Sequence, residues 1–164
     1  MGKRLALTGL LGAALVFGQD EAATQHHGRV NERGDHAMGF SHMATAHHFL
    51  LNEDGGAIQV ETIDGKDTKS RDQIRMHLKH ISVMFPAGNF EAPMFIHDKV
   101  PPGVSVMKRL SNEINYKFEA MDRGGRIQIR TKNDEALKAV HEFLRFQITD
   151  HKTGDSLEVG KRRP

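Results

Sequence analysis

The sequence predicts an α+β protein in which a ββα unit occurs twice, giving a four-stranded antiparallel sheet with two helices on one face. Three observations lead to this fold class. The stretch 49–62 recurs without a gap as 118–131, with six of fourteen positions identical, which indicates an internal repeat. Both stretches alternate apolar and polar residues around a Gly-Gly pair. Each is followed by apolar residues at helical spacing.

Each copy is predicted to form a β-hairpin. In the second copy Ile114, Tyr116 and Phe118 alternate with polar residues, and so do Ile127 and Ile129, so one side of each strand should face a core. The Gly-Gly pair is assigned to the turn, because glycine tolerates positive φ. One hairpin cannot bury its apolar side alone, whereas two hairpins side by side can.

A helix is predicted after each hairpin. The first should be capped by Thr68 or Ser70 and run to about Phe85, with apolar residues spaced by four, three and four positions. The proline and glycine that follow should end it. The second should be capped by Asn133 and end before Gly154.

The remaining segments complete the predicted domain organisation. A single domain is expected over residues 46–155, with an inter-repeat loop at 86–103 and a short helix over 104–112. Residues 156–164 are assigned to a basic C-terminal tail. Residues 19–45 lack periodicity and are rich in glycine, alanine, histidine and charge. They are therefore expected to be a flexible arm, extended or disordered.

Residues 1–18 have the pattern of a secretory signal peptide. A basic start precedes an uncharged apolar run over 5–17, and Gly18 suits the position before cleavage. An apolar run of this length is shorter than the roughly 20 residues that a membrane span needs. We therefore expect a periplasmic or secreted protein after cleavage near Gly18, with no stable membrane span.

Charge and composition exclude several classes. Cleavage would remove Lys3 and Arg4, so the 23 basic residues fall to 21 and equal the 21 acidic ones, which does not favour nucleic-acid binding. The chain has no cysteine, so disulfides and thiolate chemistry are excluded and a metal would need histidine, methionine or carboxylate ligands. Motifs for serine hydrolases, zinc peptidases, phosphate loops and dinucleotide binding are missing.

Histidine is the unusual residue of this sequence. Eleven are present, and six lie within residues 26–48. Histidine-rich tracts are a compositional signal for metal binding, and methionines in the same arm suit copper, while imidazole alone suits zinc. The alternative is that these are ordinary polar side chains. The candidate ligands of this secondary metal arm are His26, His27, His36, His42 and His48.

A more specific metal site is predicted on the first helix. His77, His80 and Met84 follow one flank of its apolar stripe. Two imidazoles and a thioether on one side suit a transition metal. His97 in the inter-repeat loop, or His47, whose counterpart in the second copy is a tyrosine on the core side, would complete the site. The alternative is that His77 lies at the core edge and Met84 fills the core.

The leading functional hypothesis is an exported, non-catalytic binding protein for a transition metal, with copper favoured and zinc second. Haem held by the same residues is a weaker alternative. An enzyme of unknown class, using the loop over His97, is another. A metal-free module could instead dimerise or bind an envelope partner through the outward face of the sheet, for which the candidate residues are Leu50, Arg126, Gln128 and Arg130.

Overall fold

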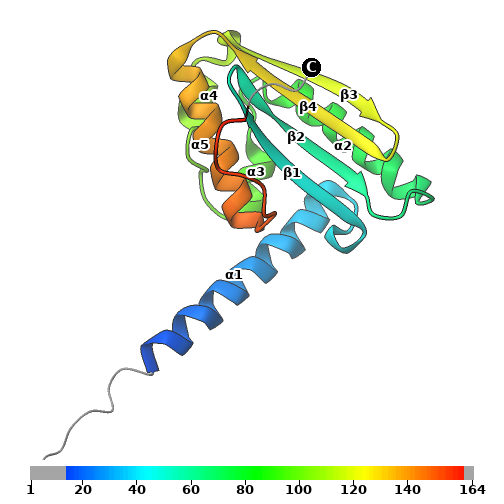
Figure 1. Ribbon diagram of the computed structural model, residues 1–164, viewed down its shortest axis with the longest axis vertical. Helices are drawn as coiled ribbons and strands as arrows, with labels where there is room; N and C mark the ends of the chain where they lie inside the picture. The colour runs from blue at the N-terminus through cyan, green and yellow to red at the C-terminus, as the bar shows by residue number, and fades with distance from the viewer. Residues whose placement is uncertain (1–13, 161–164) are drawn as a thin grey trace, which may run out of the picture.

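Four strands form one antiparallel sheet in the order β1-β2-β4-β3 (Figure 1). The computed structural model describes residues 14–160. Helices α2 and α5 follow the first and second hairpin and pack against the sheet, so the predicted α+β fold with two ββα units is confirmed. The elements are β1 (Thr45–Asn52), β2 (Gly55–Thr62), β3 (Ile114–Met121), β4 (Gly124–Thr131), α2 (Thr68–Met84) and α5 (Asp134–His151).

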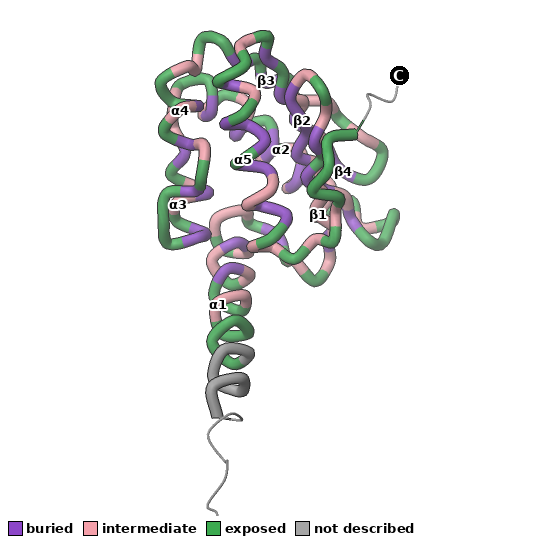
Figure 2. Tube along the Cα trace, turned by 60° about the vertical axis from the view of Figure 1, so that its left-hand side comes forward, coloured by how far each residue is buried: buried purple, intermediate pink, exposed green. Residues whose placement is uncertain are grey.

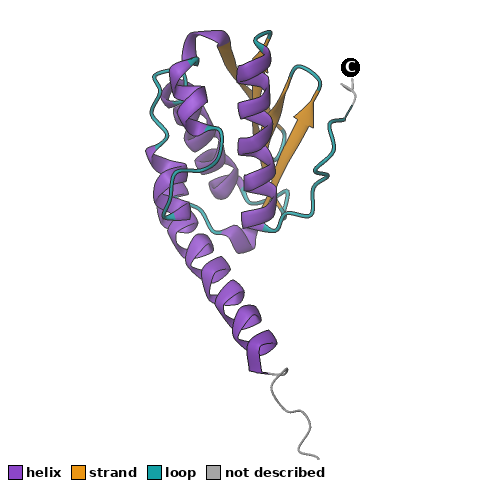
Figure 3. Ribbon diagram, turned by 90° about the vertical axis from the view of Figure 1, so that its left-hand side faces the viewer, coloured by secondary structure: helices purple, strands orange, loops and turns teal. Residues whose placement is uncertain are grey.

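The repeats are arranged about the central β2–β4 pair. Ile58 lies opposite Ile127, its counterpart in the other repeat. Helix α2 packs mainly on β4 and β3, whereas α5 packs mainly on β1 and β2. Each helix therefore covers the hairpin of the other repeat. Both helices lie on the same side of the sheet (Figure 3).

The Gly-Gly pairs have a different role from the one that the sequence suggested. The turns are formed by residues 53–54 and 122–123, and the glycines that follow begin β2 and β4. A Cβ on Gly56 would lie 2.3 Å from Leu144 Cδ1. A Cβ on Gly125 would lie 2.8 Å from Phe118 Cε2 and 3.3 Å from Leu78 Cδ1. Glycine is therefore needed here for the close approach of neighbouring side chains.

Helix α1 (Ala14–Met38) replaces most of the arm that we expected to be extended or disordered over residues 19–45. Its N-terminal part projects from the body (Figure 1), and among residues 21–38, whose burial is described, the buried positions lie toward the C-terminal end (Figure 2). Val30 is fully buried, and Arg33 Nε donates a hydrogen bond to Ile96 O at 2.8 Å. Alanine, glutamate, glutamine and arginine favour this helix. Its apolar stripe is narrow, so the sequence shows no clear helical periodicity here.

The predicted signal peptide falls mainly outside the described residues. Residues 14–18 form the start of α1, and residues 1–13 are not described. No helix within residues 14–160 is long and apolar enough to cross a membrane.

Two further helices lie between the repeats. Helix α3 (Glu91–His97) occupies the predicted loop, and α4 (Val104–Arg109) precedes β3. Phe90, which starts α3, stacks on Phe85 at 4.3 Å between ring centroids. The segment is thus part of the core. Short 3-10 helices lie at His42–Ala44 and Ser111–Glu113.

The C-terminal segment is docked on β1. The Asp155 carboxylate accepts hydrogen bonds from Phe49 N–H at 2.9 Å and from the Thr153 hydroxyl at 2.6 Å. Farther along, Gly160 N–H donates to Leu51 O at 2.9 Å. Residues 155–160 therefore lie against β1, joined to it by side-chain contacts and by one isolated parallel bridge between Gly160 and Asn52.

Candidate functional site

A small cavity of about 70 Å³ lies between the sheet and helices α2, α3 and α5. Its wall is mostly apolar. A water molecule occupies about 30 Å³ of liquid, and an apolar cavity known to bind benzene measures about 150 Å³. The cavity therefore has room for an ion or very few small molecules. The polar or sulfur-bearing side chains in its wall are Met38, His47, His77, Gln147 and His151.

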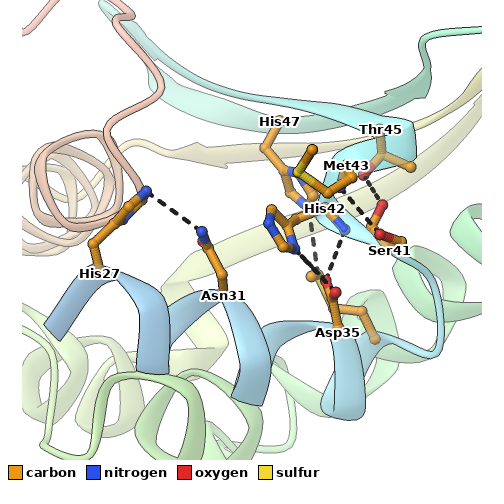
Figure 4. A network of polar contacts seen from close by, with 9 residues as sticks. His27, Asn31, Asp35, Ser41, His42, Met43, Thr45 and His47 are labelled. Carbon is orange, nitrogen blue, oxygen red and sulfur yellow. Dashed lines mark hydrogen bonds and ion pairs between the residues drawn. The ribbon is translucent and has the colours of Figure 1, made fainter. Parts of the chain in front are cut away.

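His47 points from β1 toward the C-terminal end of α1 (Figure 4). Its Nε2 lies 3.3 Å from the sulfur of Met38. Its ring stacks on Phe40, with centroids 6.0 Å apart, and lies parallel to His151 at 6.2 Å. Burial lowers the pKa of His47 to about 4, and His77 adds to the effect. The imidazole is therefore neutral at pH 7.

His77 and His151 bring two more neutral imidazoles to the same wall. Burial lowers the pKa of His77 to about 4, with a smaller effect from His80. Burial also lowers the pKa of His151 to about 3, and His97 contributes. The His77 ring meets Phe40 edge-on at 5.9 Å between centroids, and the His151 ring stacks on Phe49 at 5.6 Å. Neutral imidazoles of this kind have lone pairs available for a ligand.

His97 forms a separate, fully buried network beside the cavity. Its Nδ1 donates to Asp150 Oδ2 at 2.6 Å, and its Nε2 lies 2.9 Å from the side-chain amide of Gln147. Asp150 also accepts a hydrogen bond from His26 Nε2 at 3.0 Å. Burial acts to raise the pKa of Asp150, but the hydrogen bonds from His26 and His97 hold it below its usual value. Both nitrogens of His97 are thus engaged, and neither is free to bind a metal.

The structure brings together only part of the predicted helix site. His77 and His47 line one cavity, whereas His80 is exposed and Met84 does not line the cavity. His97 turns toward Asp150 instead. Two further side chains line the cavity: Met38, one of the arm methionines, which the sequence does not connect with the helix site, and His151, from the end of α5, which the sequence does not indicate as a ligand.

The histidines of the predicted secondary arm lie at separate places. His26 and His27 contact Asp150, at the end of α5. His42 contacts Asp35, as Figure 4 shows. His36 meets the ring of Phe95 edge-on, and His48 contacts Asp155 at 2.9 Å. These contacts hold helices and the C-terminal segment in place, and they do not gather the five imidazoles at one point.

The predicted partner surface lies on the opposite side of the sheet. Leu50, Arg126, Gln128 and Arg130 line one groove of about 790 Å³, together with the C-terminal segment. Arg126 pairs with Glu119 at 3.0 Å and Arg130 with Asp54 at 3.6 Å. Opposite charges therefore alternate along this face.

Within residues 14–160, no group of three or more histidine, aspartate or glutamate side chains is arranged to hold a metal ion. Met38 adds a thioether beside His47, with its sulfur 3.3 Å from His47 Nε2. Comparison with protein-family models, curated proteins and solved structures finds no match.

Proposed function

We propose that this protein is an exported, non-catalytic binding protein for a transition-metal ion, with copper favoured, and that the histidine-lined cavity is its site. The observation that carries the proposal is the 3.3 Å approach of Met38 Sδ to His47 Nε2 at the wall of a cavity that His77 and His151 also line. The metal would be bound first by Met38, His47 and His77, with His151 as a further ligand.

The donor set favours copper on chemical grounds. A thioether is a soft ligand that selects Cu(I), and imidazole suits copper and zinc. The described wall has no carboxylate, so hard cations such as Mg²⁺ and Ca²⁺ have little to bind. Zinc, bound by imidazoles alone, is the second choice. Because the pKa values of His47 and His77 are about 4, no proton has to leave either ring at neutral pH.

Binding requires the side chains to converge. The rings of His47 and His151 are parallel, with centroids 6.2 Å apart and an interplanar angle of 1°. The volume of about 70 Å³ suits an ion. It is too small for haem, since even benzene occupies a larger cavity. We therefore do not extend the proposal to haem.

Copper titration of the full chain as exported tests the proposal. Wild-type protein should bind one equivalent of Cu(I) in competition with a chelator. The variant His47→Ala with His77→Ala should lose more than about 100-fold in affinity, exceeding the loss typical of outer-shell partners. The matched control is His42→Ala with His48→Ala, two histidines outside the cavity, and its affinity should stay unchanged. Equal affinities in all three proteins would contradict the proposal.

Self-association through the groove on the open face is a second candidate function. The groove carries Arg126 and Arg130 beside Asp54 and Glu158, so its charges can complement those of a second copy across a two-fold axis. Light scattering should then show a dimer that survives chelator. Leu50→Asp with Arg126→Glu should dissociate it. A wild-type monomer at high concentration would exclude this candidate.

A further inference from the structure

The turn between α5 and the C-terminal segment holds its backbone in an unfavourable conformation. Lys152, which ends α5, has a φ of 53°, and Gly154 has a φ of 77°. Within residues 14–160, Lys152 and Asp98 are the two non-glycine residues with positive φ. This left-handed conformation is costly for a residue with a Cβ atom. Backbone strain is therefore stored at the point where the chain reverses direction.

The segment that follows, residues 155–160, is attached to the backbone of β1 at two positions. Figure 1 shows it, in red, turning back from the end of α5 along β1. The Asp155 carboxylate accepts a hydrogen bond from Phe49 N–H, and Gly160 N–H donates to Leu51 O, each at 2.9 Å. The apolar side chains of the segment stay partly exposed, at 48% for residue 157 and 39% for residue 159. Local opening of such a segment requires less free energy than unfolding of the core.

Release of the segment leaves β1 as an open edge of the sheet. Phe49 and Leu51 direct backbone hydrogen-bonding groups away from β2, as their contacts with the segment show. An edge strand with free backbone groups can bind a segment of another chain. The sequence that already fits this edge is 155–160, and every copy of the protein carries it. A second copy is therefore the partner whose chemistry matches the edge.

We propose that residues 152–154 act as a hinge and that two copies of the protein exchange their C-terminal segments, each segment docking on β1 of the other copy. The docking contacts are the same in the closed monomer and in the exchanged dimer, so they do not favour either form. An extended hinge takes negative φ and loses its strain, which favours exchange, whereas association costs freedom of motion. This dimer needs no metal. It also differs from association through the open-face groove, in which each copy keeps its own segment.

Disulfide trapping of the full chain distinguishes the two forms. The protein has no cysteine, so the double variant Asn52→Cys with Gly160→Cys contains a single introduced pair. These positions face each other in a parallel bridge, at a spacing that suits a disulfide. Unlabelled and ¹⁵N-labelled protein are mixed, incubated at high concentration and oxidised. Exchange should give disulfide-linked peptides in which one partner carries the label, whereas closed monomers give linked peptides of one isotope only.

Gly154→Ala tests the hinge itself. Nothing lies within 4 Å of the added Cβ, so its cost arises from the positive φ and applies to the closed form. Sedimentation equilibrium should show a dimer dissociation constant at least about tenfold lower than that of the wild type. Gly88→Ala is the matched control, because Gly88 has a φ of 74° and equal space but lies between α2 and α3. Its dissociation constant should equal that of the wild type. Lys152→Gly relieves strain and should shift the equilibrium toward the monomer.

A third variant identifies the surface that holds the dimer. Asp155→Ala, combined with Gly154→Ala, removes the docking contact in both forms and should return the protein to a monomer. A Gly154→Ala protein that stays monomeric at high concentration and gives no mixed-isotope peptide would overturn the inference. So would a dimer that persists without Asp155, since another surface would then hold it. Both results would leave the proposed metal site in place, because copper titration tests that site separately.

Discussion

Leu144, on the helix of the second repeat, packs directly over Gly56, in the hairpin of the first, where a Cβ would lie 2.3 Å from the leucine Cδ1. The reciprocal contact places Leu78, from the first repeat, over Gly125 of the second, at 3.3 Å from such a Cβ. Both contacts cross between repeats. The two ββα units are thus interlocked, and the cavity lies within the core that they share.

Replacing Gly56 should be costly because its neighbours cannot move far. In Gly56→Ala the new methyl group would meet Leu144 Cδ1 and the backbone oxygen of Leu50, each at 2.3 Å. Overpacking of this kind typically costs about 1–3 kcal/mol, and urea unfolding should show the loss. Gly28→Ala is the matched control, because nothing lies within 4 Å of its added Cβ on α1. It should be neutral or stabilise the protein, since alanine favours a helix by about 1 kcal/mol. Equal effects would contradict the packing argument.

Neither half of the chain should fold alone. Helices α2 and α5 each pack mainly on the hairpin of the other repeat, so a fragment containing residues 39–88 would expose the apolar face of its own hairpin. We expect poorly dispersed amide resonances from fragments 39–88 and 89–160 separately. Mixing them should restore the dispersion of the intact protein. A well-dispersed spectrum from either fragment alone would show that a single repeat is sufficient.

The metal-free protein should lose stability in mild acid. The pKa values of His47, His77 and His151 are about 4, 4 and 3 in the folded protein, against an ordinary value of 6.5. Between pH 6.5 and about 4 the unfolded chain binds protons that the folded chain does not, so the unfolding free energy falls as pH falls. The contribution of these neutral imidazoles to the unfolding free energy is therefore complete above pH 6.5. Each unit of lowered pKa corresponds to about 1.4 kcal/mol.

Urea unfolding at pH 7, 6 and 5 measures this dependence. His151→Phe removes one of the three groups and preserves an aromatic ring beside Phe49, on which His151 stacks at 5.6 Å. The pH dependence of this variant should be shallower than that of the wild type. A wild-type stability that stays constant from pH 7 to pH 5 would show that these imidazoles are not buried as described.

Asp155 should control the docking of the C-terminal segment. Its carboxylate holds Phe49 N–H and His48 Nδ1, each at 2.9 Å, and the Thr153 hydroxyl at 2.6 Å. Asp155→Ala should release residues 155–160 from β1 and lower the unfolding free energy by about 1.5–3 kcal/mol, the range for hydrogen bonds to a charged group. Hydrogen exchange of the Gly160 amide, which donates to Leu51 O, gives the local readout. Unchanged protection at Gly160 would contradict this role.

The fold could be predicted where the residue pattern is local. Strand alternation identified both hairpins, and Asn133 caps α5 as expected. Helix α1 was missed because most of its exposed surface is polar, and Val30 is one of few apolar anchors. Helix α3 is hard to recognise in the sequence because it is short and contains Pro93, although proline is tolerated in the first turn of a helix. The Gly-Gly pairs suggest turns because glycine tolerates positive φ, whereas their contacts with leucines from distant helices leave no mark on the local sequence.

The site was only partly accessible from the sequence. The repeat placed His47 on the core side, and helical spacing placed His77 at the core edge, and both line the cavity. His80 lies farther from the apolar stripe around the circumference of α2 and is exposed. A residue beside the stripe is buried only where another element of the fold covers it. Met38 and His151 reach the cavity through the packing of α1 and α5. This packing joins segments far apart in the chain, so no local sequence pattern predicts it.

The pairing of Ile58 with Ile127 across the sheet centre relates two halves that are alike in backbone but have diverged in side chains. In one half the core side of the strand presents an imidazole at His47, and in the other a phenol at the equivalent Tyr116. A dimer of identical subunits would have to accept every substitution twice. Joining both copies in one chain lets each half mutate independently, so one can specialise in ligand chemistry while the other preserves the scaffold.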